Sequence, residues 1–167
     1  QSGELPQPSK RFDLFPQIEG VELADCRYLP LEGSSIYSMI LDLPFLATQG
    51  VSLKTEEGNL MVRRFGVYPN EKALYELYQA AMREAWRLLK PQGILVMKCQ
   101  DKVSSGKQYM MHCDIYQWAK DLGFIIEDLF VLLAKTRLVA GWQRNQKHAR
   151  KYHCYFWVFR KPKQKRR

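Results

Sequence analysis

The stretch Ser35-Ile36-Tyr37-Ser38-Met39-Ile40-Leu41-Asp42-Leu43-Pro44-Phe45 decides the fold, because strand-forming residues lead directly into an acidic, proline-containing and aromatic end. Its apolar run predicts a strand that is buried on both faces. Pro44 restricts Leu43 to an extended backbone, so the carbonyl groups here can point toward a ligand. Ligands of open α/β sheets bind beyond the carboxyl ends of the strands. We therefore expect Asp42 to accept hydrogen bonds from an amino group and Phe45 to stack on a flat ring; a plain strand end, with Phe45 in the core, is the alternative.

A long helix is the clearest element downstream of this strand. Asn70 predicts its N-cap, and Pro91 with Gly93 predicts its end. Its apolar residues fall on one stripe at helical spacing, which indicates core packing: Leu74, Leu77, Tyr78, Ala81, Ala85, Leu88 and Leu89. Residues 46–69, before the helix, lack a clear period and favour a mobile cover over a bound substrate.

The second half of the chain alternates between strands and a helix. The predicted elements, in chain order, are a buried strand at 93–99, a polar loop at 101–108, a helix at 112–122 that Gly123 stops, and strands at 124–134 and 152–159. We expect the last two strands to form an antiparallel pair at the edge of the sheet. This order of elements predicts an α/β fold.

Composition and charge limit the classes of function. The 167 residues suit one globular domain, and there is no apolar run long enough for a membrane span and no signal-peptide pattern. We therefore expect an intracellular protein, cytoplasmic or nuclear. The four cysteines lack metal-ligand spacing, which predicts reduced thiols and no metal site. Residues 135–167 hold 12 of the 26 Lys and Arg residues and no Asp or Glu, which is typical of a polyanion-binding face or of a solvated tail.

Three segments resemble the family of S-adenosylmethionine-dependent amino-methyltransferases. Asp42-Leu43-Pro44-Phe45 is similar to their Asp/Asn/Ser-Pro-Pro-Tyr/Phe motif, with Leu43 in place of the first proline. The segment from Ala24-Asp25 to Leu29-Pro30 resembles the loop before their catalytic strand. Residues 87–96, RLLKPQGILV, resemble a helix-to-strand passage that methyltransferases of many substrates share.

The resemblance implies a Rossmann-like class I methyltransferase sheet, mostly parallel, with a C-terminal antiparallel hairpin, and leaves open a truncated or permuted form. It covers residues 21–161, which we expect to follow an irregular lead-in (1–20) and to precede a basic tail (162–167). It implies that Asp25, Asp42 and Pro44 bind S-adenosylmethionine. It also implies that Asp42, Leu43, Pro44 and Phe45 are the catalytic residues, which receive a flipped base and methylate adenine N6 or cytosine N4.

Nucleic acid is the expected partner, with DNA favoured over RNA. The residues predicted to contact phosphates are Arg63, Arg64, Arg144, Lys147, Arg150 and Lys151. Arg63 and Arg64 could equally be plain solvent-facing charges.

A glycine-rich cofactor loop of the type Asp/Glu-x-Phe/x-Gly-x-Gly is missing from the sequence. Three explanations stay open: the loop lies on another chain or a removed segment, the chain is an inactive relative, or an unrecognised N-terminal loop replaces it. The inactive relative would be a nucleic-acid-binding or partner subunit, which could pair with a second methyltransferase-like subunit or form a homodimer.

Overall fold

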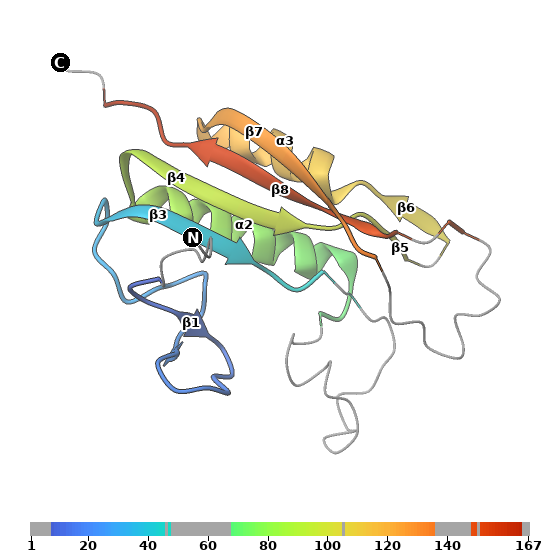
Figure 1. The fold of residues 1–167 in the computed structure, drawn as a ribbon, viewed down its shortest axis with the longest axis horizontal. Helices are drawn as coiled ribbons and strands as arrows, with labels where there is room; N and C mark the ends of the chain where they lie inside the picture. The colour runs from blue at the N-terminus through green and yellow to red at the C-terminus, as the bar shows by residue number, and fades with distance from the viewer. Residues whose placement is uncertain are drawn as a thin grey trace.

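The computed structural model describes residues 8–45, 47, 68–104, 106–135, 148–149 and 151–164. A four-stranded sheet forms its centre, and its strands, in spatial order, are β3 (Ile36–Asp42), β4 (Leu89–Cys99), β8 (His153–Arg160) and β7 (Ile125–Leu133). β3 and β4 are parallel, whereas β8 runs antiparallel to both of its neighbours. The helices α2 (Glu71–Leu88) and α3 (Met111–Leu122) lie behind the sheet in Figure 1. The predicted α/β class and the C-terminal antiparallel pair are therefore confirmed.

Helix α2 begins where its sequence signal predicts, and both of its ends are capped. The side chain of Asn70 accepts a hydrogen bond from Ala73 N at 2.9 Å, as an N-cap does. At the other end, Lys161 Nζ donates to the carbonyl oxygens of Trp86 (2.6 Å) and Leu89 (2.8 Å) and satisfies groups that the helix leaves unpaired. The segment after the C-terminal strand thus fixes the end of α2.

The hydrophobic core lies between the two helices and one face of the sheet. The stripe predicted on α2 packs there, and alternate residues of β4 and β8 face it. Core residues that are fully buried include Leu74, Tyr78, Ala81, Ala85, Leu95, Met97, Ile115 and Phe159. Deleting such a side chain to alanine costs about 2–5 kcal/mol in other proteins, so this layer supplies much of the stability.

The prediction that the 35–45 strand is buried on both faces is wrong. Leu41 is 4% exposed, but Ile40 is 70% exposed and Tyr37 is 73% exposed. The cause is that no described helix covers the second face of the sheet, and no described strand pairs with the outer edge of β3 (Figure 1). On this uncovered face the register aligns Ile40, Val96 and Val158 across three strands.

Helix α2 ends earlier than Pro91 and Gly93 predict. The helix ends at Leu88 and the strand already starts at Leu89, before Pro91 and Gly93. Residues 90–93 bulge out, because Ile36 pairs with Leu89 whereas Ser38 pairs with Ile94. A Cβ atom at Gly93 would lie 2.8 Å from the Lys90 carbonyl oxygen, so the close approach requires glycine here.

Two short pairs of strands correct the expected loops. The polar loop predicted at 101–108 is a hairpin of β5 (Lys102–Ser104) and β6 (Lys107–Tyr109). The irregular lead-in contains β1 (Phe12–Asp13), which pairs in parallel with β2 (Glu22–Leu23). Residues 48–67 and 136–147, where the cover and part of the basic segment were predicted, lie outside the described residues.

A buried carboxylate joins α2 to the segment before β3. Glu84 is 7% exposed and accepts hydrogen bonds from Leu29 N (2.8 Å) and from Arg87 Nε and Nη2 (2.7 and 2.6 Å). The Arg87 guanidinium is the main reason that the pKa of Glu84 lies below its ordinary value of 4.5. Arg87 also donates to the Leu31 carbonyl at 3.0 Å, so both side chains hold the 29–31 turn.

We expect Glu84→Gln to lower the free energy of unfolding by about 2 kcal/mol at pH 7, because the hydrogen bonds to a charged group are weakened. A lowered carboxylate pKa stabilises the folded state above the ordinary pKa, and this gain is lost as the pH falls through the lowered value. The wild-type and variant stabilities should therefore converge as the pH falls below the lowered pKa of Glu84. Urea denaturation across pH measures this; Glu76→Gln, in an exposed 3.9 Å pair with Lys72, is the control and should change stability by less than about 0.5 kcal/mol.

Candidate functional site

Asp42 ends β3 and presents its carboxylate at the carboxyl edge of the sheet. It is paired in register with Lys98 on β4, and its Oδ2 lies 2.8 Å from Lys98 Nζ. The Asp42 side chain is 61% exposed and that of Lys98 is 33% exposed. The Asp42 carboxylate is therefore accessible to solvent, and its role in binding a ligand stays a prediction.

Two of the three residues after Asp42 have backbone carbonyl groups that accept hydrogen bonds from largely buried side chains. Leu43 is buried, and its carbonyl oxygen accepts a long hydrogen bond of 3.4 Å from the hydroxyl of the fully buried Tyr78. A carbonyl oxygen has two lone pairs, so this contact leaves one acceptor position of Leu43 for another donor. The Phe45 carbonyl oxygen accepts from Lys102 Nζ at 2.8 Å. Pro44 and Phe45 are both half-buried, so the structure places Phe45 neither deep in the core nor fully in solvent.

Lys102 links this motif to the first turn of α2. Its ammonium lies 2.6 Å from Glu71 Oε2, and both side chains are only 10% exposed. Burial lowers the pKa of Lys102, and the pairing with Glu71 opposes that shift. The ion pair is largely buried, and Lys102 uses it as a base from which to fix the Phe45 backbone. Removing one partner from such a buried pair is expected to lower the free energy of unfolding strongly.

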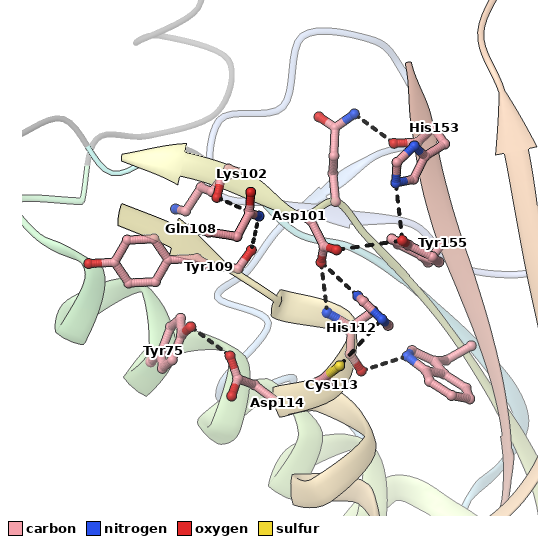
Figure 2. Close-up of polar contacts among 12 residues, drawn as sticks. Tyr75, Asp101, Lys102, Gln108, Tyr109, His112, Cys113, Asp114, His153 and Tyr155 are labelled. Atoms are coloured by element: carbon pink, nitrogen blue, oxygen red, sulfur yellow. Dashed lines mark hydrogen bonds and ion pairs between the residues drawn. The ribbon is translucent and has the colours of Figure 1, made fainter. Parts of the chain in front are cut away.

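A second group of polar side chains lies at the same edge, as Figure 2 shows. Asp101 lies between the end of β4 and the start of β5 and is 3% exposed. Its Oδ1 accepts from His112 Nδ1 at 2.8 Å and from His112 N at 3.3 Å. The His112 ring stacks on Tyr155 with the ring centroids 4.3 Å apart. The Tyr155 hydroxyl lies 3.5 Å from Asp101 Oδ2 and 3.0 Å from His153 Nε2. This network joins β4, α3 and β8 immediately beside Lys102.

The sequence reasoning missed this network, although a signal was present. Asp101 is an acidic residue two positions after a buried strand, and it falls in the segment 101–108 that the sequence predicts to be a polar loop. No sequence motif links Asp101 to His112 or His153. Their convergence depends on the antiparallel pairing of β8 with β4, which a sequence pattern does not specify in register.

Asp25 lies in a turn before β3 and already has a partner. Its Oδ1 and Oδ2 each accept from Arg27 Nε at 3.0 Å, and Oδ2 accepts from Arg27 Nη2 at 2.6 Å. These hydrogen bonds from Arg27 are the main reason that the pKa of Asp25 is lowered. Asp25 stays a predicted cofactor residue, and a cofactor there would have to share or displace Arg27.

The structure describes only one of the six residues that the sequence predicts to contact phosphates. Five of the six lie outside the described residues: Arg63, Arg64, Arg144, Lys147 and Arg150. Lys151 is half-buried just before β8. Within the described ranges, no group of three or more His, Cys, Asp and Glu residues could hold a metal ion, and no helix is long and apolar enough to cross a membrane.

Comparisons with known proteins identify the fold. No protein-family model matches the sequence, and no curated protein matches it either. Among solved structures, the chain is similar to a proposed DNA modification methylase from Thermus thermophilus complexed with S-adenosyl-L-methionine, with a TM-score of 0.57 and 21% identity over 86% of this chain and 55% of that chain. It is also similar to the cytosine-N4-specific PvuII DNA methyltransferase, with a TM-score of 0.53 and 17% identity over 80% of this chain and 46% of that chain.

The structure is therefore an α/β fold with a mixed sheet that matches class I methyltransferase structures. At this level of identity the similarity shows the fold alone. The chain spans about half the length of the solved structures it matches.

Proposed function

We propose that this chain carries the methyl-acceptor half of an S-adenosylmethionine-dependent enzyme that methylates an exocyclic amino group of a nucleic-acid base, adenine N6 or cytosine N4. The observation that carries the proposal is the position of Asp42-Leu43-Pro44-Phe45 at the carboxyl edge of a class I sheet, with the Asp42 carboxylate 61% exposed. Structures with the same fold include a cytosine-N4-specific DNA methyltransferase.

The residues of the motif have complementary roles in this proposal. S-adenosylmethionine supplies an electrophilic methyl group when it is bound. The Asp42 carboxylate and the free lone pair of the Leu43 carbonyl accept hydrogen bonds from the target amino group, which aims the nitrogen lone pair outward. Phe45 stacks on the base, and Lys102 holds the Phe45 backbone at 2.8 Å. The proton that the nitrogen loses leaves through the group that accepts its N–H, Asp42.

The residues at this edge fit the cofactor in part. Asp42 has an exposed carboxylate, and Pro44 is half-buried beside it, so both can line the methyl-donor side. Asp25 would contact the adenine group of the cofactor only if that group displaced Arg27 or bound Asp25 together with it. The basic residues of the C-terminal segment would bind the phosphate backbone of the nucleic acid around the flipped base. DNA is favoured over RNA as this nucleic acid.

Calorimetric titration with S-adenosylmethionine tests the cofactor part. We expect micromolar binding that Asp42→Ala weakens about tenfold or more, because a removed charged acceptor costs about 1.5–3 kcal/mol. The matched control is Glu127→Ala, which removes an exposed strand carboxylate from a comparable ion pair with Arg160 (2.7 Å) and should leave binding unchanged. Equal affinities of the wild type and Asp42→Ala would argue against a cofactor contact at Asp42.

A second candidate function, that of a partner subunit without activity of its own, is favoured by the uncovered side of the sheet. The outer edge of β3 has no described strand beside it, and the exposed Ile40 stands on a face with Val96 and Val158. This function predicts self-association in sedimentation velocity that Ile40→Lys reduces, together with no cofactor binding. A monomer that binds S-adenosylmethionine would exclude it.

A further inference from the structure

Cys113 lies in the first turn of α3 with its thiol facing a histidine that is itself oriented by a buried acid. Cys113 is exposed, and its Sγ lies 3.3 Å from His112 Nε2 (Figure 2). On the other side of the imidazole, His112 Nδ1 lies 2.8 Å from Asp101 Oδ1. The three side chains therefore form a continuous chain from a 3% exposed carboxylate to a solvent-accessible sulfur.

The contacts of Asp101 determine which nitrogen of His112 carries the proton. A carboxylate oxygen only accepts hydrogen bonds, and Asp101 Oδ1 also receives the backbone N–H of His112 at 3.3 Å. In the neutral imidazole this contact favours the tautomer with the ring proton on Nδ1, and Nε2 then faces the Cys113 thiol with a lone pair. The sulfur has a proton acceptor at hydrogen-bond distance, as activated cysteine nucleophiles require.

Further contacts prevent the imidazole from turning away. The Tyr155 ring stacks on it at 4.3 Å with an interplanar angle of 19°. Trp157 Nε1 donates to the His112 carbonyl oxygen at 3.0 Å and fixes the backbone. The nearest acid on the same helix turn, Asp114, is occupied by the Tyr75 hydroxyl at 2.6 Å. A helix cap alone would need the Asp101 contact to His112 N but neither the ring contact nor the stacked tyrosine.

We propose that Cys113, His112 and Asp101 form a thiol-activating triad, and that Cys113 is a modification site for thiol–disulfide exchange with small disulfides. The Cys113 proton passes to His112 Nε2, and the thiolate sulfur attacks one sulfur of the disulfide. The disulfide S–S bond breaks as the new one forms, and the departing thiolate takes the proton from Nε2. One mixed disulfide and one free thiol result, so no further oxidant is needed.

The other cysteines provide internal controls. Burial raises the pKa of the buried Cys99 thiol and raises that of Cys26 to about 11. Cys154 lies half-buried on β8. Among the described residues, Cys113 is the cysteine that is both exposed and within hydrogen-bond distance of an imidazole. The proposal does not depend on methyl transfer, although Asp101 is the direct neighbour of Lys102, which holds the Phe45 backbone.

The test is the rate of mixed-disulfide formation with an aromatic disulfide reagent, followed by absorbance and assigned by mass spectrometry between pH 5.5 and 9. We expect one fast thiol per chain, at Cys113, which reacts at pH 6 about tenfold or more faster than the same protein's cysteines in urea. His112→Gln should remove most of this advantage and move the pH profile toward that of an ordinary thiol. Gln117→Ala removes an exposed hydrogen bond to Asp121 (2.8 Å) on the same helix, away from the sulfur and the imidazole, and should leave the rate unchanged, which controls for general loosening of α3.

Two results would overturn the proposal. One is a Cys113 rate in the folded chain that equals the rate in urea across the pH range. The other is a His112→Gln variant, folded by circular dichroism, that keeps the wild-type pH profile. If Asp101→Asn, which keeps an acceptor for the helix N–H, lowers the rate while the helix content is unchanged, the carboxylate acts through the imidazole as a positioning residue.

Discussion

Replacing Asp42 with alanine should lower the rate of methyl transfer about 100-fold or more while leaving the fold intact. The expected loss follows from the proposed role of Asp42, since removing one preorganised hydrogen-bonding group at a reacting centre typically costs about 100- to 1,000-fold. The fold should tolerate the change because the Asp42 side chain is 61% exposed and pairs with Lys98 on the neighbouring strand. An exposed ion pair of this kind contributes about 1 kcal/mol or less.

A graded series makes this prediction sharper. Asp42→Asn keeps an acceptor oxygen of the same size, and the resembling motif also carries Asn at this position, so it should retain far more activity than Asp42→Ala. Transfer of a labelled methyl group to DNA, measured under single-turnover conditions, gives the rates. Glu127→Ala, the matched strand carboxylate, should behave as the wild type. If Asp42→Ala and Glu127→Ala transfer methyl groups equally fast, Asp42 has no role in the chemistry.

Lys102→Met should lower the free energy of unfolding by about 3–5 kcal/mol. Lys102 and Glu71 are each 10% exposed, so the substitution leaves a carboxylate largely out of water without its 2.6 Å partner. It also removes the donor to the Phe45 carbonyl oxygen. Chemical denaturation of the wild type and variant measures the difference in the free energy of unfolding.

The double variant Lys102→Met/Glu71→Leu separates stability from positioning. Replacing both members of a buried ion pair by apolar residues is often close to neutral, so we expect most of the stability to return. The hydrogen bond from Lys102 to the Phe45 carbonyl oxygen is still missing in the double variant. Methyl transfer should therefore remain impaired even when the double variant is fully folded. A double variant as unstable as the single one would show that the ion pair is not the source of the loss, and full activity would show that Phe45 needs no such support.

The sequence was sufficient for the elements whose signals are local. The cap at Asn70, the stripe on α2, the stop at Gly123 (φ 92°) and the strand that ends at Asp42 all follow from short-range patterns, and the structure confirms them. Local signals also explain the C-terminal pair of strands, because two apolar runs joined by a polar segment have few ways to enter one sheet.

The sequence was insufficient where the outcome depends on partners distant in the chain. The strand at 36–42 looked buried on both faces because its residues are apolar, yet burial requires a covering layer that apolarity alone does not provide, and Ile40 is 70% exposed. Similarly, Asp101 and His112 meet Tyr155 only through the pairing of Cys99 with Tyr155 across β4 and β8. The roles of Asp42, Leu43, Pro44, Phe45 and Asp25 stay predictions.

The most direct test of the central claim is to incubate the chain with DNA and S-adenosylmethionine that carries a deuterated methyl group, digest the DNA, and analyse the nucleosides by mass spectrometry. The account predicts deuterated N6-methyladenine or N4-methylcytosine, formed by the wild type and lost in Asp42→Ala. A folded wild-type chain that binds S-adenosylmethionine but forms neither nucleoside, or that forms them equally well without the Asp42 carboxylate, would contradict it.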